Sequence, residues 1–597
     1  MKLPRMKEIA VQRSMIDVFK GYNHNLRIGE NEFYDMENLT STSYPVLSPR
    51  GKRGEYKTAN PESPQALIQK DALCYVDGTD FVINGYRVNM DLSVDPDDCP
   101  KQLVSMGAYV IILPDKKYIK IITNKGDGSD YEFGNIEATV STVDTVRFEM
   151  CKVDGSYYEN TVTSVSEPTI TEEMESGDEQ IPYWIDTSTT PHSLKQYSTS
   201  LFCWTAVATS YVKITSSGIG KPFEVGDGVT ISGIEIEQLS DLNNTMIIWG
   251  KGDDYIIVTG IIDAVATQNK TVMVSRRMPN MDFVIESENR LWGCRYGVAL
   301  NGEVVNEIYA SKLGDFKNWN CFAGVSTDSY AVTVGTDGQF TGAITHLGYP
   351  LFFKENFVHK VYGNYPANYQ ITTTACRGVQ KGSHKSLAIV NEVLYYKSRS
   401  AVCAYDGSLP QEISYGLGEV AYEKAVAGSH ANKYYISMQE SDTGKWHLFV
   451  YDASKGMWHR EDSTRAVDFC SCRGEMYYID HADSKIKTVH GSGDPFESEV
   501  EWMAETGLIG TDSPDRKYVS KLNIRMSLEL GAQMRVYIQY DSYGDWEHIS
   551  SAVGHTIDSF TVHIRPRRCD HLRLRFEGEG ECKIFSITKT IEQGSDR

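Results

Sequence analysis

The chain has 597 residues, of which 41% are hydrophobic and 23% charged, so it can bury several cores and does not have the composition of a disordered protein. Its net charge of −21 argues against a surface that grips nucleic acid, because such grip depends on an excess of Lys and Arg. No apolar stretch approaches the length of a membrane helix and the first residues lack the apolar core of a signal peptide, so we expect synthesis in a cytoplasm without membrane insertion.

The composition favours strands over helices. There are 36 tyrosines, which suit half-buried pleated surfaces, and 49 glycines, which suit tight turns. We therefore expect an all-β fold. By sequence pattern the chain divides into five segments: 1–60, 61–134, 135–281, 282–494 and 495–597.

Residues 1–60 have few periodic apolar positions. The run Tyr44-Pro45-Val46-Leu47-Ser48-Pro49-Arg50-Gly51 holds two prolines close together, and a proline favours extended backbone in the residue before it. We expect an extended N-terminal arm that becomes ordered by lying on a neighbouring protein.

Residues 61–134 and 282–494 carry a repeat of short strands. Aromatic doublets stand 43, 39 and 43 residues apart, at Phe352-Phe353, Tyr395-Tyr396, Tyr434-Tyr435 and Tyr477-Tyr478. A period of about 40–45 residues is typical of the four-stranded blades of a β-propeller. Looser copies at 73–78, 109–115 and 289–294 bring the expected number of blades to about seven. A series of unrelated β-meanders stays open as the alternative.

Between residues 135 and 281 the blade repeat disappears. Thr- and Val-rich segments with glycine turns, such as 223–233, predict a small β-sandwich or barrel inserted into the propeller. The acidic stretch 171–179 is interpreted as a solvated loop and not as a metal site.

Residues 495–597 alternate between apolar and polar positions. One such set is Leu522, Ile524, Met526, Leu528 and Leu530, which we expect to share a face, and the segments 534–538 and 572–576 repeat the pattern. Alternation of period two with one apolar face predicts a β-sandwich at the C-terminus.

The sequence holds no arrangement of residues typical of catalysis or of metal binding. It lacks phosphate loops, His-Glu-x-x-His helices and Gly-x-Ser-x-Gly elbows. His548 and His555 do not have metal-ligand spacing, and a single residue separates Cys470 from Cys472, where structural zinc sites have about two to four. We therefore predict no catalytic residue, no cofactor-binding residue, no metal ligand and no cofactor, and we expect that the chain is not an enzyme.

One turn resembles a feature of sialidase-type propellers. Ser441-Asp442-Thr443-Gly444-Lys445-Trp446 is similar to their aspartate-box turn, in which Asp accepts hydrogen bonds from backbone N–H groups and Trp packs beneath. The turn is structural, so it favours a propeller. Hydrolysis of a glycan stays an alternative, because the sequence does not show which of its 80 acidic residues form pairs.

Three segments resemble the bacteriophage packaged-DNA stabilisation proteins, also called tail hub or nozzle proteins. They are Asn38-Leu39 with 44–51, then Asn289-Arg290-Leu291-Trp292-Gly293 with 308–319, and finally 565–576. The likeness is scattered over most of the chain, each motif is moderately specific, and 135–281 has no counterpart.

This resemblance implies a structural virion protein, located in the tail, that forms a ring of six below the portal and its adaptor. It would contact these and other tail proteins, extend the DNA channel and retain packaged DNA until ejection. Double-stranded DNA is expected to pass while weakly held, since an acidic wall repels phosphates. The rival function is a receptor- or glycan-binding adhesin at the tail tip, and less so a glycan hydrolase.

Overall fold

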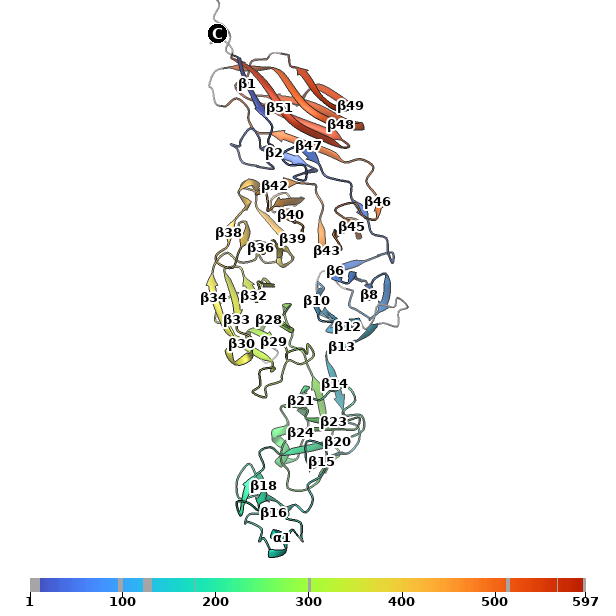
Figure 1. The fold of residues 1–597 in the computed structure, drawn as a ribbon, viewed down its shortest axis with the longest axis vertical. Coiled ribbons are helices and arrows are strands. Elements are labelled where there is room, and N and C mark those ends of the chain that lie inside the picture. The colour runs from blue at the N-terminus through green and yellow to red at the C-terminus, as the bar shows by residue number, and fades with distance from the viewer. Residues whose placement is uncertain are drawn as a thin grey trace, which may run out of the picture. The chain divides into compact units, whose positions relative to one another are not determined.

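Strands make up nearly all of the regular structure. The computed structural model describes residues 11–94, 100–121, 131–177, 179–298, 302–511, 516–565 and 567–593, whose course Figure 1 shows. Within these ranges lie 51 strands, the single-turn helix α1 (Glu172–Ser176) and four short 3-10 helices. None of these helices is long and apolar enough to span a membrane. The expected class, an all-β chain with a β-propeller, an inserted β domain and a C-terminal sandwich, is confirmed.

The chain divides into two compact units. The first comprises Met1–Leu103, Thr336–Lys360 and Thr372–Arg597, and the second comprises Val104–Gly335 and Val361–Ile371. The first unit contains the C-terminal sandwich and most of the propeller sheets. The second contains the inserted domain and two further propeller sheets.

Five antiparallel propeller sheets lie wholly or mainly in the first unit. Their strands are β6 (Pro64–Lys70), β7 (Ala72–Asp77), β8 (Asp80–Ile83) and β9 (Tyr86–Asn89); β31 (Gly342–His346), β32 (Tyr349–Lys354), β33 (Phe357–Tyr362) and β34 (Gln370–Ala375); β35 (Ala388–Val390), β36 (Val393–Lys397), β37 (Val402–Tyr405) and β38 (Gln411–Glu412); β39 (Tyr422–His430), β40 (Lys433–Glu440), β41 (Trp446–Asp452) and β42 (Met457–Arg460); and β43 (Ala466–Cys472), β44 (Glu475–Asp480), β45 (Lys485–Thr488), β5 (Gly54–Glu55) and β46 (Asp494–Pro495). The 3-10 helices η2 (Pro366–Asn368), η3 (His384–Ser386) and η4 (Ser414–Leu417) lie in the connections.

The aromatic doublets occupy the second strand of their blades, as the repeat predicted; they lie in β32, β36, β40 and β44. Successive side chains of a strand point to opposite faces, so the two rings of a doublet lie on opposite faces of their blade. The ring centroid of Phe353 lies 5.2 Å from that of Tyr396, and Tyr395 lies 5.4 Å from Tyr434. Gly428 makes room for the next blade, because a Cβ there would lie 2.5 Å from the Cβ of Phe469.

The last blade includes a strand from the N-terminal part of the chain. β5 pairs with both β45 and β46, so residues 54–55 complete a sheet whose other strands begin at Ala466. This blade packs against the first one, where Leu67 and Tyr75 share a core with Ile479 and Ile486. The first and last blades of the series thus meet through an apolar contact.

The second unit holds two propeller sheets and the inserted domain. The propeller strands are β10 (Gln102–Met106), β11 (Tyr109–Leu113), β12 (Lys117–Ile121) and β13 (Tyr131–Asn135), then β27 (Phe283–Ser287), β28 (Arg290–Val298), β29 (Val304–Ala310) and β30 (Tyr330–Thr333). With the five sheets of the first unit they make seven blade-like sheets in the described residues, the number expected.

Three sheets form the inserted domain, and two of them enclose one apolar core. These two are β14 (Ala138–Ser141), β26 (Met273–Arg276), β21 (Gly228–Ser232) and β22 (Thr245–Ile247), and β23 (Gly250–Gly252), β24 (Tyr255–Thr259), β20 (Tyr211–Thr215), β15 (Val146–Cys151) and β25 (Ala266–Gln268), with the 3-10 helix η1 (Glu237–Leu242) beside them. The third is β16 (Val162–Ser164), β17 (Tyr183–Asp186), β18 (Ser193–Ser198) and β19 (Cys203–Ala206). The acidic stretch predicted as a loop contains α1, which Thr171 caps and Gly177 ends in a left-handed conformation; its side chains are not buried.

The C-terminal sheet is built around one long strand. Its order is β1 (Val11–Ile16), β51 (Cys582–Gln593), β48 (Lys517–Tyr540), β50 (Leu572–Glu579), β47 (Glu501–Thr506) and β2 (Phe33–Glu37), and β49 (Glu547–His563) also pairs with β48. The first half of β48 pairs with β51 and the second half with β50, with a break in register between Leu528 and Gln533. Leu530 falls in this break and is 99% exposed, so its predicted place on the buried face is wrong.

The N-terminal segment is part of the fold. β1 pairs with β51, β2 pairs with β47, and the short strands β3 (Leu39–Thr40) and β4 (Ser48–Pro49) pair with each other. Phe33, Met36 and Leu39 are buried in the sandwich core. The prediction that this segment orders by lying on a neighbouring protein is therefore wrong for residues 11–55, because its strands pair within the chain and several of its apolar side chains are buried in a core of the same chain.

Candidate functional site

Two sequence motifs, the close pair Cys470 and Cys472 and the turn 441–446, have structural roles. Burial raises the thiol pKa of both Cys470 and Cys472. In the turn that resembles an aspartate box, Glu440 and not Asp442 is the acceptor, since the Thr443 hydroxyl donates to Glu440 at 2.7 Å. Among the described residues no group of three or more His, Cys, Asp and Glu side chains could hold a metal ion.

Two arginines fix the N-terminal segment to the last blades. The Arg53 guanidinium is 2% exposed and donates to Glu461 at 2.7 Å and to Asp462 at 2.6 Å. Arg50 donates to both carboxylate oxygens of Glu497 at 2.8 Å. Planar, bidentate pairs of this kind are the strongest hydrogen bonds between side chains. Residues 44–51, which carry part of the family resemblance, thus include one of these two arginines, and the other follows two residues later. We call the two arginines and their three carboxylate partners the clamp.

The charges of this clamp compensate one another. Burial raises the pKa of Asp462, but the charges of Arg53 and Arg50 and the hydrogen bonds from Thr464 together outweigh it, and the pKa lies below its usual range. Burial opposes a charged Glu497 in the same way, and the hydrogen bond from Arg50 lowers its pKa. Both carboxylates are thus ionised at neutral pH because their arginines are in place.

A second buried polar cluster lies in the second unit. Arg276 is paired with Asp227 in the inserted domain, and the Asn318 side-chain amide donates to Asp227 at 2.8 Å. The Gly228 N–H donates to the side-chain oxygen Oδ1 of Asn318 at 2.9 Å. Asn318 belongs to 308–319, another segment of the resemblance, and it joins the inserted domain to the loop between β29 and β30.

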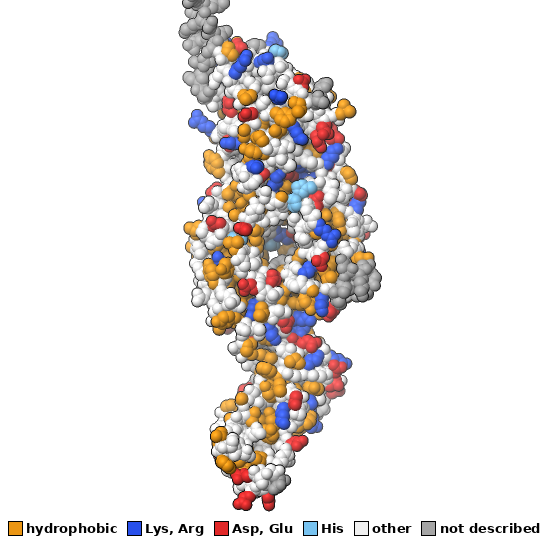
Figure 2. All heavy atoms as spheres, viewed as in Figure 1, with side chains coloured by type: hydrophobic (Ala, Val, Ile, Leu, Met, Phe, Trp, Pro, Cys, Tyr) orange, Lys and Arg blue, Asp and Glu red, His pale blue; other side chains and the backbone are white. Residues whose placement is uncertain are grey.

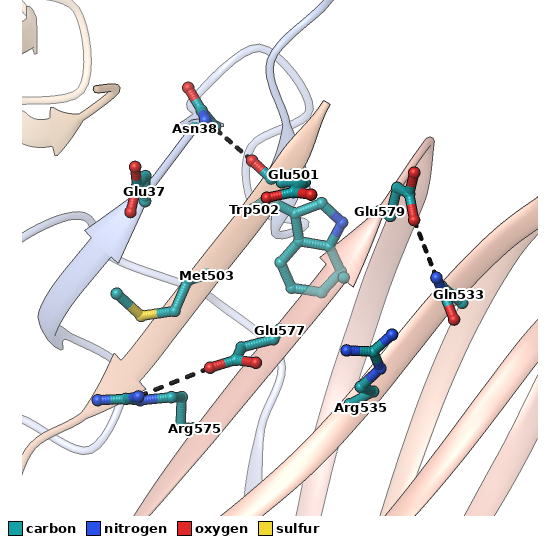
Figure 3. A pocket seen from close by; sticks show the side chains of 11 residues that line it. Glu37, Asn38, Glu501, Trp502, Met503, Gln533, Arg535, Arg575, Glu577 and Glu579 are labelled. Carbon is teal, nitrogen blue, oxygen red and sulfur yellow. Dashed lines mark hydrogen bonds and ion pairs between the residues drawn. The ribbon is translucent and has the colours of Figure 1, made fainter. Parts of the chain in front are cut away.

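An open groove that combines charged and amide side chains lies over the outer face of the C-terminal sheet (Figure 3). Its volume is about 430 Å³. It is lined by Glu37, Asn38, Glu501, Trp502, Met503, Gln533, Arg535, Arg575, Glu577, Gly578 and Glu579. These residues come from β2, the residue after it, β47, β48 and β50, so four neighbouring strands supply the lining.

Strand register places the polar side chains of the groove in rows. Glu37 stands opposite Met503, Met503 opposite Glu577, and Glu577 opposite Arg535. Directly paired residues lie on the same face of a sheet, so this row crosses four strands. Glu501, Glu579 and Gln533 form the next row, and the Gln533 amide donates to Glu579 at 2.9 Å. The intervening residues face the core, where Gly578 leaves room for the buried Trp502 ring.

The groove is rich in acceptors. Burial raises the pKa of Glu37, although Arg460 opposes the shift. Arg575 is bound to Glu505 at 2.9 Å and lies 3.6 Å from Glu577. Arg535 is exposed and forms no ion pair with any described residue. Its guanidinium is therefore a free planar donor beside several carboxylates.

Sequence reasoning missed this groove. The alternation in 572–576 predicts an apolar face but assigns no role to the polar positions between. The signal was present in the segment Arg573-Leu574-Arg575-Phe576-Glu577-Gly578-Glu579, where the outward residues change from basic to acidic along one strand. What the pattern does not give is the register that aligns them with Arg535.

Comparisons with known proteins found likeness only among solved structures. No protein family and no curated protein matches the chain. An exo-β-1,3-galactanase from Phanerochaete chrysosporium is 10% identical, with 51% of this chain and 94% of that chain covered and a TM-score of 0.20. An arabinoxylan arabinofuranohydrolase of glycoside hydrolase family 43 from Bacillus subtilis is 8% identical, with 51% and 94% covered and a TM-score of 0.15. An acylaminoacyl peptidase is 10% identical, with 48% and 47% covered and a TM-score of 0.22.

These comparisons correct one prediction. The expectation that the chain is not an enzyme is contradicted, because the solved structures to which it is similar include glycoside hydrolases, and we withdraw it. At such identities a likeness concerns the fold alone, and at such TM-scores no substrate or mechanism is carried over to this chain.

Proposed function

We propose that this chain is a structural subunit of a bacteriophage tail. In this proposal six copies form a ring below the portal and its adaptor and contact other tail proteins. The ring extends the DNA channel and retains packaged DNA until ejection.

The observation that carries the proposal is where the resembling segments lie. Arg50 of the first segment is clamped to Glu497, and Asn318 of the second is bound to Asp227. In the third, Cys569 exchanges backbone hydrogen bonds with Lys517 at 2.9 and 3.0 Å. Each segment thus joins parts of the chain that are far apart in sequence. Rigid joints of this kind suit a subunit that must repeat the same contacts around a closed ring.

Charge supports the part of the proposal that concerns DNA. The net charge is −21, and acidic and basic side chains are interspersed on the face drawn in Figure 2. Tight binding to duplex DNA depends on clustered Lys and Arg that neutralise phosphates. Interspersed charges on that face favour the passage of DNA over its tight binding.

The test is assembly of the full-length chain with the portal and adaptor proteins of the same virus, followed by electron cryomicroscopy. We expect a closed six-fold ring attached to the adaptor, and labelling of the chain in intact particles at the tail. A chain that stays monomeric with its expected neighbours, or that is missing from the particle, overturns the proposal.

A glycan-binding adhesin is the second candidate function, and the groove on the C-terminal sheet is the observation that favours it. Sites that bind hydroxyl-rich ligands combine carboxylate, amide and guanidinium groups in a recess, which is the composition of this groove.

A further inference from the structure

We infer that the groove of the C-terminal sheet binds a neutral glycan, with Arg535 and Glu577 as the pair that recognises vicinal hydroxyl groups. This inference rests on the second candidate function and is independent of the tail proposal.

The first step is the arrangement of donors and acceptors. Arg535 and Glu577 are directly paired residues on neighbouring strands, so their side chains emerge side by side on one face. A guanidinium presents several N–H donors in one plane, and a carboxylate presents two acceptor oxygens. Two hydroxyl groups on adjacent carbons can accept from the first and donate to the second at once. Ionised phosphodiesters and carboxylates have no proton to donate, so they cannot form a hydrogen bond with the Glu577 carboxylate.

The second step is the net charge of the recess. The lining carries the carboxylates Glu37, Glu501, Glu577 and Glu579 and the guanidinium groups Arg535 and Arg575. Acceptors therefore outnumber cations, and an anionic ligand would meet repulsion. A neutral ligand with many hydroxyl donors fits this balance.

The third step is the rigidity of the sheet that forms the floor of the groove. Trp502 is 3% exposed beneath Gly578, and a Cβ at position 578 would lie 2.3 Å from its ring. Met503, half-buried between Glu37 and Glu577, supplies an apolar spot among the polar side chains. The apolar face of a sugar ring can lie on such a spot while its hydroxyls reach the neighbouring rows. Because strands of one sheet hold the backbone of nearly all these residues in place, little backbone freedom is lost on binding.

The experiment uses the full-length chain on an array that presents neutral oligosaccharides, heparin fragments and an oligolysine peptide. We expect retention on at least one neutral oligosaccharide and none on heparin. The affinity for that oligosaccharide, measured by calorimetry, should fall at least tenfold in Arg535→Ala and in the isosteric Glu577→Gln. The matched control is Arg525→Ala, an exposed arginine of the same strand outside the groove, which should bind as the wild type does.

Three outcomes overturn the inference. One is retention only on heparin or only on oligolysine, which would mark the groove as a site for an anionic or a basic partner. Another is the absence of retention on any neutral oligosaccharide. The third is equal weakening by the Arg525 and Arg535 substitutions. Circular dichroism of each variant checks that the fold persists, and ring assembly measured on the same samples tests the tail proposal separately.

Discussion

At the scale of single residues, Arg53 is a buried charge whose partners are two carboxylates. Its guanidinium is buried against Glu461 and Asp462. Removing one partner of a buried ion pair leaves an uncompensated charge and costs about 3–5 kcal/mol. We expect Arg53→Ala to lower the free energy of unfolding by that amount in urea titrations.

The neighbouring Lys52 supplies the control for this prediction. Its ion pair with Glu499 is about half exposed, so Lys52→Ala should cost less than about 1 kcal/mol. Equal losses for the two variants would mean that the Arg53 clamp does not stabilise the fold.

His359 gives a second residue-scale prediction, on the dependence of stability on pH. Its ring nitrogens lie 2.9 Å from the hydroxyls of Thr336 and Thr373. Burial, with a smaller effect of Lys354, lowers the pKa of His359 to about 4. An unfolded histidine has a pKa of about 6.5, so the unfolded chain takes up the proton first as pH falls.

The contribution of His359 is therefore fully present above pH 6.5 and is lost between about pH 6.5 and 4, at about 1.4 kcal/mol per pH unit. His359→Gln keeps a hydrogen-bonding side chain and removes the titration. Urea midpoints at pH 7.5, 6.5 and 5.5 should fall less steeply in this variant than in the wild type. Parallel curves would refute the assignment.

At the scale of elements, the N-terminal segment contributes to two structures at once. β1 and β2 cover the edges of β51 and β47; Phe33 and Met36 of β2 lie in the sandwich core, and Ile16 of β1 packs against it. Deletion of residues 1–50 should therefore expose both edges and yield little folded protein. Hydrogen exchange should show loss of amide protection in β47 and β51.

A milder variant keeps this prediction testable if the deletion prevents folding altogether. Met36 is fully buried, and Met36→Ala should cost about 2–5 kcal/mol through lost burial and a cavity. A folded deletion variant with unchanged exchange in β47 and β51 would show that the segment is dispensable.

Sequence patterns predicted strands well where a local pattern of side chains alone determines the strand and its buried face. The doublets marked the second blade strands, because a strand that packs on both sides needs large side chains on both faces. The alternation from Leu522 to Leu528 marked a buried face. Both signals fail where pairing is non-local: β5 is two residues long, and its place in the last blade depends on strands that follow more than 400 residues later.

At the scale of the whole molecule, the charge predicts weak binding to DNA. With a net charge of −21 the full-length chain has no excess of cations to release counterions from phosphates. In filter-binding assays with a duplex at moderate salt we expect little retention at micromolar protein. Strong retention that falls steeply with salt would instead reveal a basic surface.

The candidate site illustrates why a site is harder to predict than a fold class. Its residues come from β2, β47, β48 and β50, which the chain visits in that order across the whole length from residue 37 to residue 579. No spacing in the sequence encodes that Glu37, Met503, Glu577 and Arg535 form one row. The register does, and in it β50 pairs with β48 from Gln533 onward, after the break that follows Leu528.

The short strand β5 also has a consequence for how the protein is made. The Gly54 N–H donates to the Thr488 hydroxyl across 434 residues, and closing a loop of that length costs roughly 5 kcal/mol in chain entropy. Translation delivers β5 early and its partner β45 late, so the last blade is completed only when synthesis is nearly over. A nascent chain halted before residue 461 still exposes Arg53 to water, where a chaperone or protease can reach it.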